Sequence, residues 1–200
     1  MKYLFIMAAM LLMVPVAQAK PYSKAKIILL NGTVMEGLAT FPEGPAPVPI
    51  QFKTDKTSKA QRINSDSIKT IIYTIDAGTT HEWDRLNAYV NGPHVKPERQ
   101  WLYVVFRGAV TLYTYGFTGD LNRYRYDDIQ TSWLCIRQGE AIATKMTSTY
   151  WKNRRNVFVD GASDYFKDDA GLVNKIQSGA YTWKDVEKIV TEYNDWKKGK

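Results

Sequence analysis

The sequence predicts an α+β protein: a mostly antiparallel β body, arranged as a sandwich or a partly open barrel, followed by a C-terminal helical hairpin. Two observations support this fold class. Short apolar runs with the two-residue period of strands recur up to Tyr150, and Gly, Pro, Asn and Asp separate them, as in antiparallel β units. After Tyr150 the apolar residues recur every three or four positions, which indicates helices.

The longest stretch with a strand period runs from Gln100 to Tyr115 and predicts a hairpin that turns at residues 107–109. Side chains alternate between the two faces of a strand, so this hairpin has two different faces. One face is mostly aliphatic and comprises Leu102, Val104, Phe106, Val110 and Leu112. The opposite face is aromatic and hydroxyl-rich and comprises Trp101, Tyr103, Val105, Thr111, Tyr113 and Tyr115.

A second hairpin is predicted from residues 24–30 and 33–41, because Asn31 and Gly32 tolerate the positive φ angles of a two-residue type I′ turn. Prolines between residues 42 and 49 then predict an extended connection, since proline has no N–H for a central ladder. Further strands are predicted at residues 50–53, near Ile63, and at 68–75, 82–90, 133–137 and 141–146, with a cap at 64–67 and a turn at 138–139. The alternation within 82–90 is poor.

The first predicted helix follows Asp168 or Asp169, either of which can cap it. Leu172, Val173 and Ile176 share one face of this helix. Gly179 is placed to end it in the left-handed conformation.

Thr182 caps the second predicted helix, and Asp185 three positions later completes a weaker form of the capping box. Its apolar stripe comprises Val186, Ile189, Val190, Tyr193 and Trp196. Each helix buries one stripe only, so the pair must pack on the sheet, on each other or on a partner.

Residues 1–19 have the pattern of a secretory signal peptide, with a charged start, a short apolar run and small residues at Ala17 and Ala19. The alternative is a membrane anchor that stays attached. We therefore expect a signal peptide at 1–19, a β-rich body at 20–150 and a helical segment at 151–200. The mature protein is expected in the periplasm, at the cell surface or outside the cell, with no transmembrane segment after cleavage.

The formal net charge is +7, with the basic residues spread along most of the chain. Such a balance favours solubility, although a basic face would attract lipopolysaccharide or another polyanion. A nucleic-acid partner is not expected for an exported chain. Cys135 is the sole cysteine, so no internal disulfide is possible, and its apolar neighbours predict a buried and unreactive thiol.

The sequence contains no recognisable catalytic motif, so no catalytic residue, metal ligand or cofactor is predicted. His81 and His94 lack the spacing of a zinc site, and no Gly-x-Ser-x-Gly elbow or Gly-rich phosphate loop is present. The acidic pairs at 127–128 and 168–169 are better explained by strand alternation and helix capping.

The most distinctive feature of the sequence is the density of aromatic residues between positions 101 and 126. Aromatic rings on a sheet stack on sugar faces, and tyrosine keeps a hydroxyl for hydrogen bonding. The predicted ligand-binding residues are Trp101, Tyr103, Tyr113, Tyr115, Tyr124 and Tyr126. The alternative is that the C-terminal helices cover these rings, which are also good strand formers.

The sequence resembles uncharacterised exported proteins of Bacteroidota-type bacteria in five segments, residues 31–37, 65–71, 164–168, 172–176 and 181–194. The resemblance implies a β-rich exported protein and carries over no catalytic residues. The sequence therefore predicts a non-enzymatic binding or envelope-associated module, with carbohydrate or an envelope component as its partner. The alternative is a hydrolase that acts on carbohydrate or peptidoglycan fragments.

Overall fold

A computed structural model of the chain describes residues 21–43, 47–75, 78–90, 96–116, 131–148 and 154–200. The described residues form one ten-stranded, mostly antiparallel sheet followed by three helices. This arrangement confirms the predicted α+β fold with a C-terminal helical part. The predicted signal peptide, Tyr124 and Tyr126 lie outside the described residues.

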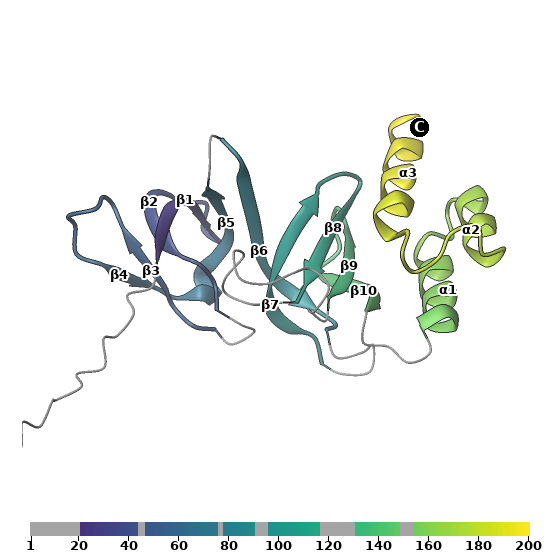
Figure 1. Cartoon of the computed structure of the whole chain (residues 1–200), viewed down its shortest axis with the longest axis horizontal. Helices are drawn as coiled ribbons and strands as arrows, with labels where there is room; N and C mark the ends of the chain where they lie inside the picture. The colour runs from purple at the N-terminus through teal and green to yellow at the C-terminus, as the bar shows by residue number, and fades with distance from the viewer. Residues whose placement is uncertain (1–20, 44–46, 76–77, 91–95, 117–130, 149–153) are drawn as a thin grey trace, which may run out of the picture.

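The elements lie along the long axis of the molecule, with β1–β5 at one end, β6–β10 in the middle and the helices at the other end (Figure 1). The strands are β1 (Tyr22–Leu29), β2 (Val34–Thr40), β3 (Ile50–Lys53), β4 (Gln61–Ile63), β5 (Ile68–Thr74), β6 (Thr80–Ala88), β7 (Glu98–Phe106), β8 (Val110–Tyr115), β9 (Ser132–Arg137) and β10 (Ile142–Ser148). A short 3-10 helix, η1 (Ser65–Ser67), precedes β5. The helices are α1 (Arg154–Tyr165), α2 (Ala170–Gln177) and α3 (Val186–Lys198).

Strands β6 to β10 close into a ring. Each strand pairs with its neighbour in antiparallel fashion. Strand β10 then pairs in parallel with β6, so that Ile142 lies opposite Asn87 and Ala143 lies opposite Ala88. The closure buries a small apolar core inside the ring, formed by Ala88, Val90, Leu102, Val104, Tyr113, Leu134 and Ala143.

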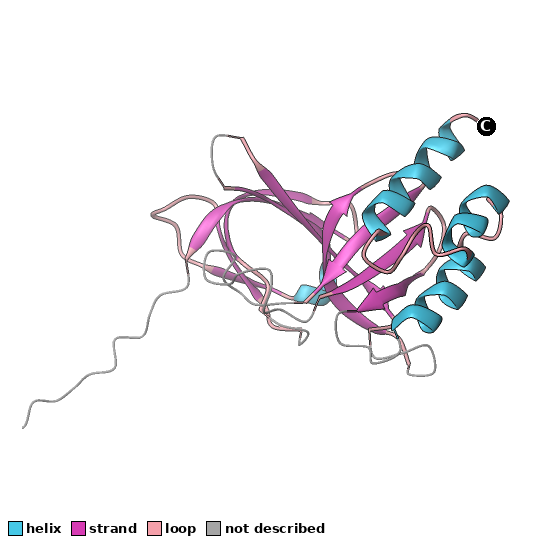
Figure 2. Ribbon diagram, turned by 45° about the vertical axis from the view of Figure 1, so that its right-hand side comes forward, coloured by secondary structure: helices cyan, strands magenta, loops and turns pink. Residues whose placement is uncertain are grey.

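Strands β1 to β5 extend the same sheet and curve around a second core (Figure 2). This N-terminal core comprises Ala25, Ile27, Ala39, Ile50, Phe52, Ile68, Ile71, Tyr73, Trp83 and Trp101. Because β6 belongs to both parts of the sheet, its two faces are covered by different groups. Trp83, Asp84 and Arg85 are therefore all buried although they are consecutive, which explains the poor alternation of this strand.

The hairpin of β7 and β8 does not have the continuous aliphatic face that the sequence predicted. The register shifts between Val104 and Phe106, so that Val104 lies opposite Tyr113. Tyr113 therefore points into the ring with Val104, whereas Leu112 packs outside it against the helices. Phe106 also packs on the helix side. The bulge inserts one residue, and one residue is enough to exchange the two faces of a strand.

The first hairpin is confirmed, but its turn is longer than predicted. The N–H of Leu29 donates to the carbonyl of Thr33 at 2.9 Å, and the N–H of Gly32 donates to that of Leu29 at 3.0 Å. Three residues, 30–32, thus lie between the hydrogen-bonded residues Leu29 and Thr33, with Gly32 in the left-handed region at φ 86°. This geometry is a type I turn followed by a glycine bulge and not a type I′ turn.

The prediction of two C-terminal helices is incomplete, because α1 precedes them. Asp169 caps α2, as its carboxylate accepts a hydrogen bond from the N–H of Leu172 at 3.1 Å, and Gly179 follows the helix at φ 80°. The third helix begins at Val186, later than predicted. Asp185 still accepts hydrogen bonds from the N–H and hydroxyl of Thr182, at 2.9 and 2.7 Å.

The helices cover the outer face of β8, β9 and β10 (Figure 2). Four of the five residues in the predicted stripe of α3 are buried in this contact, including Ile189 and Val190, and Trp196 is partly buried. The amide of Asn194 forms two hydrogen bonds with the backbone of Val110, at 2.7 Å to its N–H and 2.9 Å to its carbonyl. A β-carbon at Gly108 would lie 2.4 Å from the Asn194 nitrogen, so glycine permits this close approach.

Arg137 links the sheet to the helices. Its guanidinium lies 4.0 Å from the ring centroid of Tyr165 and donates to the Tyr193 hydroxyl at 3.4 Å. It also lies 3.5 Å from the carboxylate of Asp168. Desolvation opposes ionisation of Asp168, but hydrogen bonds from Lys197 and Tyr193 outweigh it and lower the pKa of Asp168 to about 2. The helical unit is thus attached by an ionic contact as well as an apolar one.

Cys135 lies in the apolar contact between sheet and helices and is fully buried. Burial raises the pKa of its thiol. We expect a thiol reagent to label the native protein far more slowly than the protein in denaturant, because the reactive thiolate is both rare and shielded. Mass spectrometry of the labelled protein measures this. Rapid labelling under native conditions would contradict the burial of this side chain.

Candidate functional site

The predicted ligand-binding aromatic residues do not share one face. Trp101 and Tyr103 point toward the N-terminal core, whereas Tyr113 and Tyr115 point toward the interior of the ring. The C-terminal helices cover neither pair, because they pack on the opposite face of β8. The expectation of a single aromatic surface is therefore wrong for the four described residues, and the bulge in β7 and the closure of the ring are the reasons.

Tyr103 instead belongs to an aromatic cluster that the sequence analysis missed. Its ring centroid lies 5.1 Å from that of Trp83 and 5.8 Å from that of His81. Trp83 continues to Tyr73 at 5.4 Å, and Tyr73 stacks on Phe41 at 4.3 Å. We call these five residues, contributed by β5, β6, β7 and the position directly after β2, the aromatic cluster.

The aromatic cluster has a buried base and a half-buried rim. Tyr73 and Trp83 are almost inaccessible, whereas Phe41, His81 and Tyr103 are partly exposed. At the base, the Tyr73 hydroxyl donates to the carbonyl of Thr40 at 2.6 Å. At the rim, Nδ1 of His81 and the hydroxyl of Tyr103 lie 3.1 Å apart, within hydrogen-bond distance. The base fixes the rings, and the rim presents them together with polar atoms.

The sequence contains these aromatic residues but no local pattern that joins them. Tyr73 and His81 are paired across β5 and β6, and Trp83 and Tyr103 are paired across β6 and β7. Cross-strand aromatic pairs of this kind stabilise sheets. The pairing of separate strands is not encoded locally, however, so only their register in the folded sheet brings the four rings together.

A second polar group surrounds Asp84, which points to the ring side of β6. Its carboxylate accepts hydrogen bonds from the hydroxyls of Thr70 and Tyr113, each at 2.7 Å. Nη2 of Arg107 lies 3.0 Å from both carboxylate oxygens and also binds Glu82. Desolvation, followed by the neighbouring Asp84 charge, raises the pKa of Tyr113, so its hydroxyl remains a donor.

These contacts argue for a structural role of Asp84. Glu82 and Asp84 project from the same face of β6, as a pair of catalytic carboxylates must. The oxygens of Asp84 are already occupied by three protein donors, and Arg107 bridges the two acids. The group therefore ties β5, β6 and β8 together and leaves little of Asp84 to act on a substrate.

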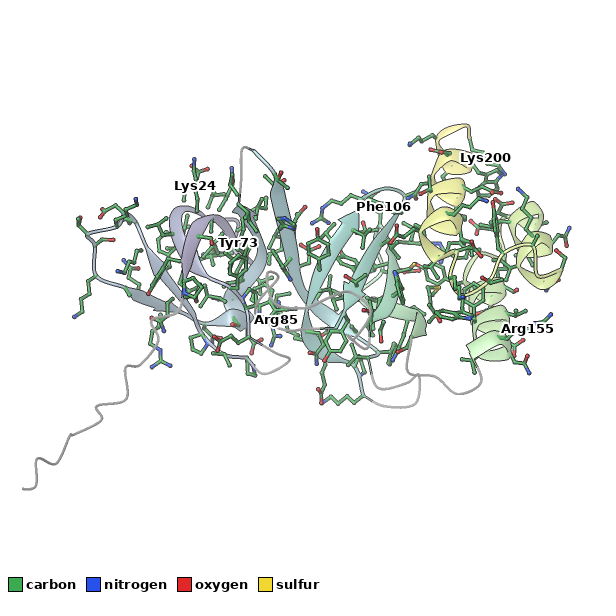
Figure 3. All side chains as sticks on the ribbon, in the orientation of Figure 1. Lys24, Tyr73, Arg85, Phe106, Arg155 and Lys200 are labelled. Carbon is green, nitrogen blue, oxygen red and sulfur yellow. The ribbon has the colours of Figure 1, made fainter. Side chains whose placement is uncertain are left out.

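A third group lies where β6 and β7 meet η1, at the lower edge of the N-terminal strands near the label of Arg85 (Figure 3). Arg85 is buried and lies 3.2 Å from the carboxylate of Asp66. Its guanidinium also lies 5.7 Å from the ring centroid of Trp101, its partner across the strands. Burial lowers the pKa of Arg85, although Asp66 opposes that shift. Arg99 donates hydrogen bonds to the backbone of η1, β5 and β6. We call Arg85, Arg99, Asp66 and Trp101 the arginine group.

Within the part of the chain that the structure describes, no three His, Cys, Asp or Glu side chains come together in a way that could hold a metal ion. Over the same residues, no helix has the length and apolar character to span a membrane. No protein-family model, curated protein or solved structure matches this chain.

Proposed function

We propose that the protein is an exported, non-enzymatic binding module whose ligand contacts the half-buried rim of the aromatic cluster. The observation that carries this proposal is the unbroken series of ring contacts from the buried Tyr73 and Trp83 to the partly exposed Phe41, His81 and Tyr103. Rings held in this way lose little conformational freedom when a ligand binds, which favours affinity.

The chemistry of the rim suits a carbohydrate. Aromatic faces pack against the apolar faces of sugar rings, while tyrosine and histidine offer hydrogen bonds to hydroxyl groups. The exported location inferred from residues 1–19 makes a cell-envelope glycan the ligand class we propose. The hydrolase alternative receives less support, because the same-face pair Glu82 and Asp84 is engaged by Arg107 and two hydroxyl donors.

A fluorescence titration tests this function. Purified full-length protein is titrated with soluble oligomers of N-acetylglucosamine, which are neutral models of an envelope glycan. Tryptophan emission is followed, to which Trp83 contributes as one of six tryptophans. We expect a saturable change in emission. Tyr103→Ala or His81→Ala should weaken binding about two- to tenfold, because one aromatic contact contributes about 0.5–1.5 kcal/mol.

The matched control is Tyr22→Ala. Tyr22 is a partly exposed tyrosine of β1 that lies outside the aromatic cluster, so its loss should leave the affinity unchanged. Thermal melts of all three variants show whether each remains folded at the titration temperature. Equal affinities for the Tyr103 and Tyr22 variants, or no saturable change with the parent protein, would remove the support for a glycan site at this rim.

A further inference from the structure

Two buried N–H donors in the arginine group have no hydrogen-bond partner among the described residues. They are Nε of Arg99 and Nε1 of Trp101. Both side chains belong to β7 and lie two positions apart, so they project from the same face of the strand. Buried polar groups are nearly always paired in folded proteins, and an exception calls for a specific explanation such as a bound ion or water.

The charges of the arginine group favour an anion over water. Arg99 donates to three backbone carbonyls, those of Asp66 at 3.1 Å, Ile68 at 3.2 Å and Arg85 at 2.7 Å. A carbonyl satisfies a hydrogen bond but carries no net charge. The carboxylate of Asp66 is bound by Arg85, and no salt bridge joins Arg99 to a described acid. A water molecule would pair the free donors and leave the excess positive charge in place.

We propose that Arg99 and Trp101 bind an anionic oxygen group, a carboxylate or a phosphate, beside η1 at the edge of the N-terminal strands. One oxygen atom of such a group accepts from the guanidinium Nε–H and the indole N–H, and its charge balances Arg99. Hydrogen bonds between an ionised donor and an ionised acceptor are stronger than neutral ones, which suits a site with only two free donors.

The site borders on solvent through η1. The side chain of Asp66 is 47% exposed, and the contact of Arg99 with the Asp66 carbonyl lies at the surface. Arg99 itself is only partly buried. The site is also separate from the rim of the aromatic cluster, because Tyr103 lies four positions further along β7 than Arg99, and the buried Trp101 and its cross-strand partner Arg85 lie between them. Anion binding at this site therefore does not depend on glycan binding at the rim.

Nuclear magnetic resonance of the tryptophan indoles tests the proposal on purified full-length protein. The variant Trp101→Phe assigns the Trp101 indole signal. The parent protein is then titrated with sodium phosphate, sodium acetate or sodium chloride at matched ionic strength. We expect phosphate or acetate to shift the Trp101 indole signal in a saturable way, with little movement of the other indoles and no saturation by chloride. The stronger of the two anions shows which chemistry the site prefers.

Variants locate the binding determinants. Arg99→Gln should weaken the binding of the preferred anion at least about tenfold, since it removes a charged hydrogen-bond partner. Arg62→Gln, an exposed arginine of β4 that makes the same change in net charge, should leave it unchanged. If Arg99→Gln does not fold, the parent titration decides by itself. A Trp101 signal that does not saturate with either anion, or equal losses in the two arginine variants, would overturn the proposal.

Discussion

The double variant Ile189→Asp, Val190→Asp is expected to unfold or aggregate. Ile189 is 1% exposed and Val190 is fully buried in the contact between α3 and the sheet. Burial of each side chain stabilises the fold by about 1.5–3 kcal/mol, against a net stability of about 5–15 kcal/mol for a typical domain. Two buried carboxylates add a desolvation cost. Circular dichroism melts and size-exclusion chromatography measure the outcome.

The matched control places two aspartates on the outer face of the same helix, as Lys188→Asp, Thr191→Asp. Both positions are exposed, so this variant should keep nearly the melting temperature of the parent and remain monomeric if the parent is. Should the Ile189 and Val190 variant behave like this control, the stripe of α3 would not be required for folding. It would then be better interpreted as a docking surface for a partner.

The variant Asp84→Ala is expected to lower the free energy of unfolding by about 3 kcal/mol, the lower end of the range for a broken buried ion pair. The lower end applies because Arg107 is 46% exposed and keeps its contact with Glu82, whereas the side chain of Asp84 is only 10% exposed. The loss also leaves the hydroxyls of Thr70 and Tyr113 without their acceptor. Urea unfolding followed by tryptophan fluorescence measures the difference.

Two further variants make this test specific. Glu36→Gln breaks the exposed pair of Glu36 with Lys26 and should cost no more than about 1 kcal/mol. Asp84→Asn keeps the shape of the side chain but not its charge, so its loss of unfolding free energy should lie between those of Asp84→Ala and Glu36→Gln. Asp84→Ala with a free energy of unfolding close to that of Glu36→Gln would mean that the network around Asp84 does not hold the strands together.

Local patterns in the sequence determined most of the secondary structure. A strand period needs only neighbouring side chains, and the predicted 50–53 strand coincides with β3. The cap at Asp169, the left-handed Gly179 and the stripe that buries Ile189 are also decided within a few residues. Helix α1 carried a similar signal, because its buried Phe158, Ala162 and Tyr165 recur at helical spacing. This signal was obscured by Gly161 and by the two valines on either side of Phe158.

The faces of the strands were decided only by the tertiary structure. The pairing of β10 with β6 joins residues that are 55 positions apart, such as Ile142 and Asn87, and no local pattern encodes such a contact. That closure covers both faces of β6 and, with the one-residue bulge in β7, sends Tyr113 into the ring and Tyr103 toward the N-terminal core. Both candidate sites depend on the same register, which places Trp83 beside Tyr103 and Arg85 beside Trp101. Aromatic residues could be found in the sequence, but which of them meet depends on pairing energies summed over the whole sheet.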